Sequence, residues 1–169
     1  PASYNDFYEW INGSWVYMDI GTVLVGLLAL RFYPFPFVTA IMAGALWFLS
    51  MDLTPWFFYG EDWYWGARED VSMWFGLAVI LVAVAVDLRK WPAGDFAFWL
   101  HLCGIVAFWG GLTMHDSDSE VSKAIYCLIN VVLVLLAVFL VRRVYAVFGA
   151  IGIAIYLGDL AENATHDLA

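Results

Sequence analysis

Charged residues are scarce in this chain, and basic residues are the scarcest of them. Of the 169 residues, 14% are charged, against about 25% in a typical soluble domain, and 64% are apolar. Seven residues are Lys or Arg and 16 are Asp or Glu, which gives a formal net charge of −9. This acidic balance, without any basic run, excludes a nucleic-acid-binding protein. The high apolar content excludes a disordered chain and indicates an integral membrane protein.

Cysteine is almost absent as well, since the chain contains only Cys103 and Cys127. Two cysteines are too few for a secreted module held together by disulfides. At a rise of about 1.5 Å per residue, the two thiols lie at membrane depths that differ by about 7–9 Å, whereas a disulfide needs Cα atoms about 4.4–6.8 Å apart. We therefore expect two free thiols. The chain also lacks a phosphate-binding loop and a G-x-S-x-G elbow, so no motif points to catalysis.

Long apolar stretches are what the chain does have. A helix needs about 20 mostly apolar residues to cross about 30 Å of hydrocarbon, because its backbone polar groups must be satisfied within the segment. The sequence predicts an all-α, polytopic membrane bundle of six transmembrane helices, at residues 14–33, 37–58, 71–86, 96–114, 121–141 and 144–160. The third and sixth stretches are short, and they span only if their acidic flanks lie at the membrane interface.

The distribution of charge predicts the orientation of these helices, because Lys and Arg in short loops stay on the cytoplasmic side. Five of the seven basic residues fall in the connections between helices 1–2, 3–4 and 5–6, namely Arg31, Arg89, Lys90, Arg142 and Arg143. All acidic residues except Asp87 and Asp95 lie toward the opposite face. We therefore expect three antiparallel hairpins with both termini and an acidic face outside the cytoplasm, in a plasma membrane or bacterial inner membrane.

The three hairpins resemble one another. Each has an acidic entry, an apolar span, a basic turn and a second apolar span, which divides one transmembrane domain into units at about 1–59, 60–114 and 115–169. Gly44, Gly104 and Gly152 fall at similar depths in the second helix of each unit, where a small residue allows close helix packing. Triplication of an ancestral hairpin explains this pattern. Any bundle of hairpins that keeps Lys and Arg in its cytoplasmic loops and packs on glycine explains it as well.

Three aspartates, Asp19, Asp52 and Asp159, are predicted to lie at membrane depth in the outer half of their helices. An ionisable group there costs several kcal/mol unless it finds a partner, water or a proton. The basic residues on the outer side are Arg68 and Lys123, so salt bridges can compensate two of the three at most. The aspartates are either hydrated at frayed helix ends or, if they face inward, form one functional cluster.

Two further polar residues lie deeper in the predicted spans. His101 is about 10 Å from the cytoplasmic end of the fourth helix, at a rise of about 1.5 Å per residue. No second histidine lies at a matching depth, so a bis-histidine haem is not expected. His101 is then a hydrogen-bonded packing residue or a proton carrier. Asn130, near the middle of the fifth helix, is expected to hold helices together.

A divalent metal is the one cofactor for which the sequence offers candidate ligands. If the sixth helix continues past residue 160, Asp159, Glu162 and His166 share one helix face, and His115 comes from a loop at the same membrane surface. Nitrogen and carboxylate ligands of this kind suit zinc. A solvated acidic cap explains the same residues without any metal.

Three functions follow from these observations, in decreasing order of support. The first is a non-catalytic accessory, scaffold or partner-binding bundle, with lipid and other membrane subunits as partners and neither nucleic acid nor a cofactor. The second is a small channel or carrier for protons, cations or a polar solute. It would use Asp19, Asp52 and Asp159 as an outer vestibule, with Asn130 and His101 below. The third is a membrane metallohydrolase built on the histidine and carboxylate group.

Overall fold

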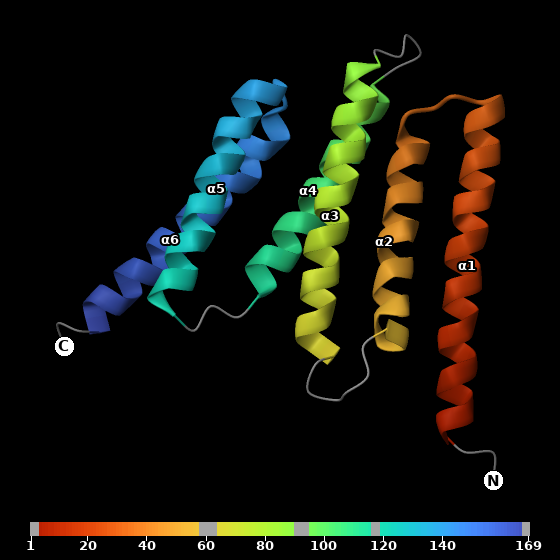
Figure 1. Ribbon diagram of the computed structural model, residues 1–169, viewed down its shortest axis with the longest axis horizontal. Helices are drawn as coiled ribbons and strands as arrows, with labels where there is room; N and C mark the ends of the chain where they lie inside the picture. Colours follow the sequence, from red (N-terminus) through yellow and green to blue (C-terminus); the bar gives the residue numbers. More distant parts are fainter. Residues whose placement is uncertain (1–3, 58–63, 90–94, 116–118, 167–169) are drawn as a thin grey trace. The chain divides into compact units, whose positions relative to one another are not determined.

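The computed structural model describes the backbone of residues 4–57, 64–89, 95–115 and 119–166, and the side chains of residues 15–54, 67–89, 95–115 and 119–163. Every regular element in these ranges is an α helix (Figure 1). The helices are α1 (Tyr4–Phe32), α2 (Phe37–Phe57), α3 (Tyr64–Leu88), α4 (Phe96–Met114), α5 (Glu120–Leu140) and α6 (Arg143–His166). All six are long and apolar enough to cross a membrane, so the chain is a multi-pass helical membrane protein, as predicted.

The helices α1, α3 and α6 are longer than their apolar stretches. α3 begins at Tyr64, before the predicted start at residue 71, and its apolar span covers Ala67–Leu88. α6 continues to His166, and its span covers Arg143–Asn163. Polar residues at the interface continue a helix when no proline interrupts it, whereas hydropathy marks only the part inside the hydrocarbon. The two stretches that looked short are therefore long enough to span.

The helix ends follow local chemistry. α1 stops before Pro34 and Pro36, which have no N–H to donate, and the last bond of its final turn runs from Tyr33 N to Ala29 O at 2.7 Å. Ser119 caps α5, because its hydroxyl accepts the N–H of Ser122 at 3.1 Å. Val141 ends α5 with φ 55°, a left-handed conformation that a β-branched residue rarely adopts. The connection between α5 and α6 is therefore very tight.

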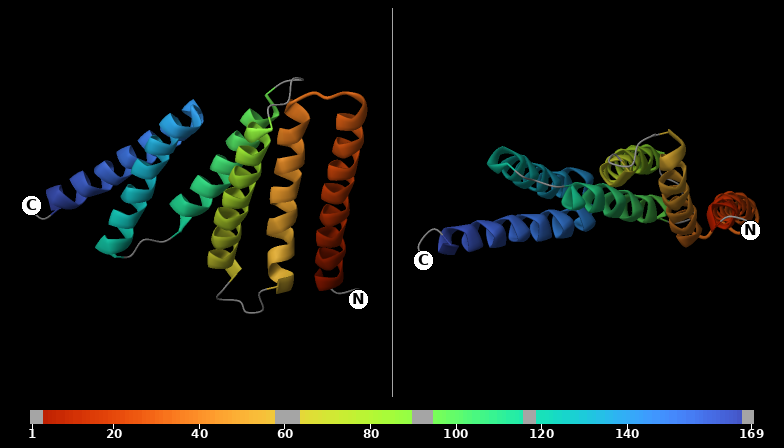
Figure 2. Two further views of the ribbon diagram at one scale, coloured as in Figure 1. Left: turned by 45° about the horizontal axis from the view of Figure 1, so that its top comes forward. Right: turned by 90° about the horizontal axis from the view of Figure 1, so that it is seen from below.

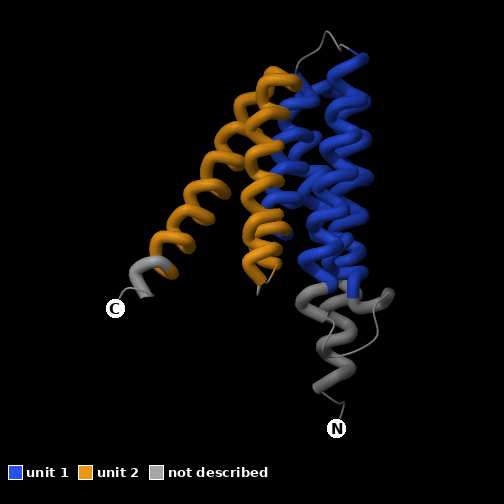
Figure 3. The backbone as a smooth tube through the Cα atoms, turned by 60° about the vertical axis from the view of Figure 1, so that its left-hand side comes forward, with its two compact units in different colours: residues 1–111 blue, residues 112–169 orange. Residues whose placement is uncertain are grey.

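The chain consists of two compact units, which we call unit 1 (Pro1–Gly111) and unit 2 (Leu112–Ala169) and which Figure 3 shows in blue and orange. In unit 1, α2 packs against both α1 and α3. In unit 2, α5 and α6 pack along each other. The three predicted hairpin units and their orientation across a membrane stay predictions.

Glycines bring α3 and α4 close together in unit 1. A β carbon added to Gly76 would overlap the backbone of Phe108, and one added to Gly104 would lie 2.8 Å from Ile80 Cγ1. These contacts confirm that Gly104 serves close helix packing. Gly44 differs, because a β carbon there would meet no atom of the described residues within 4 Å. The expectation of equivalent packing roles for the glycines of the three hairpins is therefore wrong for Gly44.

Candidate functional site

A polar pocket of about 300 Å³ lies in unit 2, where the end of α4 meets α5 and α6. Its polar lining consists of Thr113, His115, Lys123, Tyr126, Tyr156 and Asp159. The hydroxyl groups of Thr113 and Tyr126 lie 3.2 Å apart, which joins α4 to α5 by a hydrogen bond. This pocket contains one of the three predicted aspartates, Asp159.

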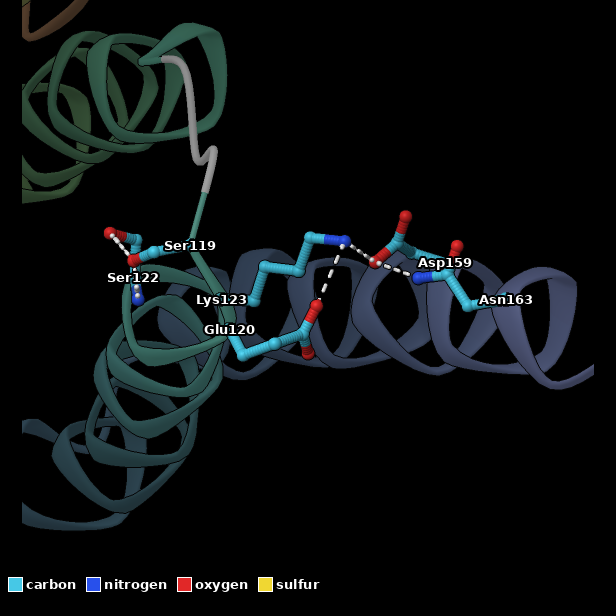
Figure 4. A network of polar contacts seen from close by, with 6 residues as sticks. All are labelled: Ser119, Glu120, Ser122, Lys123, Asp159 and Asn163. Atoms are coloured by element: carbon cyan, nitrogen blue, oxygen red, sulfur yellow. Dashed lines mark hydrogen bonds and ion pairs between the residues drawn. The ribbon is translucent and has the colours of Figure 1, made fainter. Parts of the chain in front are cut away.

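An ion pair between α5 and α6 dominates this pocket (Figure 4). Lys123 Nζ lies 2.8 Å from Asp159 Oδ2 and 3.8 Å from Glu120 Oε1. Asn163, one turn after Asp159 on the same helix, donates its amide to the same carboxylate oxygen at 3.4 Å. Lysine therefore compensates the charge of Asp159, which is one of the alternatives that the sequence left open.

The other two aspartates belong to unit 1, on the helices α1 and α2, which pack against each other. Asp19 on α1 is 8% exposed, and Asp52 on α2 is half-buried. The structure thus places two of the three predicted aspartates on adjacent helices and gives the third, Asp159, a lysine.

His101 is fully buried in unit 1, and its Nε2 atom lies 2.9 Å from Asp87 Oδ2. Asp87 is the penultimate residue of α3, and His101 lies in the second turn of α4. Sequence analysis named His101 but not its partner. Both residues flank the same short connection between helices, and that proximity is the signal that could have identified the pair.

Asn130 of α5 is also fully buried, and it packs against α6. Its Nδ2 donates to the backbone oxygen of Tyr126 at 2.8 Å, and its Oδ1 faces Gly152. The side chain therefore fills the close contact between two helices. The hydrogen bond to Tyr126 stays within α5, and the expected role of Asn130 in holding helices together stays a prediction.

Another chain of hydrogen bonds crosses three helices of unit 1. Trp47 Nε1 donates to Ser72 Oγ at 3.0 Å, and Ser72 Oγ donates to the backbone oxygen of Ala107 at 2.8 Å. Ser72 is buried. Sequence analysis missed these residues, because the sequence does not show whether a Trp or a Ser within an apolar span faces lipid or another helix. The bonds connect α2, α3 and α4.

Several of the polar contacts join one helix to another: His101 to Asp87 in unit 1, and Lys123 to Asp159 in unit 2. No family model, curated protein or solved structure matches this chain.

Of the four predicted metal ligands, the structure describes the side chains of three: His115, Asp159 and Glu162. His115 and Asp159 line the same pocket, and Glu162 lies on α6 one turn after Asp159. The side chain of His166 lies outside the described residues. Among the described side chains, no group of three or more His, Cys, Asp or Glu residues could hold a metal. The divalent metal site stays a prediction, whereas the two free thiols, Cys103 and Cys127, are confirmed.

Proposed function

We propose that this protein is a non-catalytic bundle of membrane helices that acts as an accessory, scaffold or partner-binding subunit. The supporting observation is the use of polar side chains at membrane depth. His101 binds Asp87, Asn130 packs on Gly152, and Lys123 pairs with Asp159. Each of these side chains contacts a neighbouring helix, and polar groups used in this way stabilise helix association in lipid.

The outer surface of the helices supports the same proposal. Large apolar side chains on α5 recur every three or four residues and are between 46% and 82% exposed, namely Val121, Ile125, Leu128, Val132, Leu135 and Phe139. Such spacing forms one continuous stripe along a helix. The stripe offers a surface for lipid or for a helix of another membrane protein.

Photo-crosslinking in the native membrane tests the proposal. A photoreactive residue is placed at Leu135, which is 54% exposed, and a matched control at Leu133 of the same helix, which is 4% exposed. A partner-binding bundle gives discrete protein adducts of constant mass from position 135 and few from position 133. Adducts to lipid alone at every exposed position of the stripe on α5 would contradict a partner on this face.

The proposal includes the orientation expected from the charge distribution. The three hairpins place both termini and the acidic face outside the cytoplasm, in a plasma membrane or bacterial inner membrane. In a Cys103→Ser and Cys127→Ser background, Ala2→Cys should react with a membrane-impermeant thiol reagent in intact cells. Ala93→Cys should react only after permeabilisation. The reverse pattern would overturn the orientation.

A small channel or carrier is the second candidate, and the position of Asp19 and Asp52 on the packed helices α1 and α2 favours it. Carboxyl groups at membrane depth mark many ion and proton pathways. Proteoliposomes decide between the candidates. A carrier moves protons or cations and loses this flux in the Asp52→Asn plus Asp159→Asn variant, whereas a scaffold shows no flux to lose. The metallohydrolase remains a third hypothesis, which elemental analysis without stoichiometric metal would remove.

A further inference from the structure

A second cavity, of about 420 Å³, lies in unit 1 among the ends of four helices. The end of α1, the start of α2, the end of α3 and the start of α4 meet at one end of this unit (Figure 2). Six of its nine lining residues are aliphatic, aromatic or proline, and the others are Arg31, Thr39 and Arg89. The cavity therefore combines an apolar wall with two guanidinium groups.

Both arginines lie at the boundary of the hydrocarbon. Arg31 is the penultimate residue of the apolar span Trp15–Phe32, and Arg89 directly follows the span Ala67–Leu88. Both side chains are exposed. The end of a span coincides with the level of the lipid headgroups, so the two guanidinium groups lie where lipid phosphates lie.

The described residues of the lining carry two positive charges and no carboxylate. Two aspartates are close by in sequence, and each has another role. Asp87 pairs with His101, and Asp95 caps α4 by accepting the N–H of Phe98 at 2.9 Å. Thr39 donates its hydroxyl to the backbone oxygen of Pro36 at 2.6 Å. Among the described residues of the lining, the charge that faces a ligand is therefore that of the two arginines.

We propose that this cavity binds one anionic phospholipid. The phosphate lies between Arg31 and Arg89, and the adjoining part of an acyl chain packs on Leu27, Leu30 and Leu100. Guanidinium groups bind phosphate through paired hydrogen bonds, and basic pockets between membrane helices suit anionic headgroups. A free phosphate would leave the apolar wall without contacts. The positive-inside rule accounts for arginines in these loops, but it does not require a cavity between them.

The size of the cavity is consistent with part of a lipid. Its volume falls within the range of about 300–1,000 Å³ found for small-molecule sites. Leu27 is 53% exposed and Leu24, one turn earlier on α1, is 56% exposed. The acyl chain can therefore leave the cavity and continue along α1 in contact with the bilayer.

Native mass spectrometry of the full chain in neutral detergent tests this site. The protein is titrated with phosphatidylglycerol and with phosphatidylcholine of identical acyl chains. Wild type should retain one phosphatidylglycerol preferentially. The Arg31→Gln plus Arg89→Gln variant should bind it about 25-fold more weakly, because each basic residue near an anionic surface contributes about fivefold. Arg143→Gln, which removes an arginine that does not line the cavity, should bind as wild type does.

Further variants separate the contributions of the phosphate and the acyl chain. Arg31→Lys plus Arg89→Lys keeps the charge and should retain most of the preference, and Leu100→Trp should weaken binding by filling the cavity. Inorganic phosphate at millimolar concentration should not displace the lipid. Each single Arg→Gln variant supplies the same comparison if the double variant elutes as an aggregate.

Any of four results would overturn the proposal. These are equal retention of the two lipids by wild type, unchanged binding by the Gln variants, an equal loss in Arg143→Gln, and displacement of the lipid by inorganic phosphate. The last result would identify a free anion as the ligand.

Discussion

The side-chain amide of Asn130 on α5 lies against Gly152 on α6 so closely that a β carbon at position 152 would overlap it. Gly149, almost one turn earlier, approaches the same residue, since a β carbon there would lie 2.6 Å from the backbone oxygen of Asn130. A fully buried amide on one helix thus fits two glycines on the other. Small residues that allow this approach replace the hydrophobic effect, which is absent between helices in lipid.

Gly152→Ala should destabilise the protein, because the added methyl group overlaps the amide of Asn130. Overpacking of a close contact costs about 1–3 kcal/mol. Gly158→Ala is the matched control on α6, since a β carbon there meets no described atom within 4 Å. Alanine forms helix better than glycine, so the control should be neutral or stabilising. Unfolding in mixed detergent micelles, followed by circular dichroism, gives both values, and equal effects would contradict the close contact.

Gly76→Ala should lower the free energy of unfolding at least as much as Gly152→Ala does. The atoms that its β carbon would meet belong to the backbone of α4 at Phe108 and Gly104, and backbone cannot rotate away as a side chain can. Gly110→Ala on α4 is the control, because the space beside it is open. The same unfolding experiment applies. A cost below that of Gly110→Ala would show that α3 and α4 can separate freely.

Replacement of Lys123 and Asp159 by alanine, singly and together, should reveal a small favourable coupling between the two side chains. The pair is partly exposed, with 24% and 43% of the two side chains accessible, and water and salt weaken such ion pairs. The coupling should decrease as the salt concentration rises. A double-mutant cycle measured at low and high salt provides the test, and a coupling that salt leaves unchanged would argue against an ion pair open to solvent.

Asp87→Ala should destabilise unit 1, because it removes the carboxylate 2.9 Å from the fully buried His101. Loss of a partner for a buried polar group costs about 1–3 kcal/mol. Asp87→Asn keeps a hydrogen-bonding group of the same shape and should cost less. The two variants are compared by the same unfolding measurement. If alanine and asparagine have equal effects, the contact with His101 does not contribute to stability.

Much of the fold was predictable because the bilayer constrains it. The boundaries of α4 agree with those expected, and all six spans were found, since backbone groups in hydrocarbon can be satisfied only within long apolar helices. The helix ends in polar regions were less predictable. There α1, α3 and α6 continue beyond the apolar stretch, because hydropathy does not report where a helix stops in water.

The sequence predicted which polar residues stand out as candidates, but it did not predict which residues they contact. Asp19, Asp52, Asp159, His101 and Asn130 stood out because a polar group at membrane depth needs compensation. The partners of Asp159 and His101 were not evident, nor was the absence of a close contact at Gly44. Distance along a helix follows from a rise of about 1.5 Å per residue, but the direction of a side chain depends on how its helix is rotated against its neighbours.

The sequence by itself determined the class of protein, the number of its apolar helices and the level of each polar group along its helix. Those properties follow from the cost of placing peptide and charged groups in hydrocarbon. Only the tertiary structure decided which groups meet, because lysine, histidine and asparagine find their partners through the packing of specific helix faces. The cavity between Arg31 and Arg89 likewise exists only because two pairs of helix ends, α1 with α2 and α3 with α4, lie together although they are distant from each other in the chain.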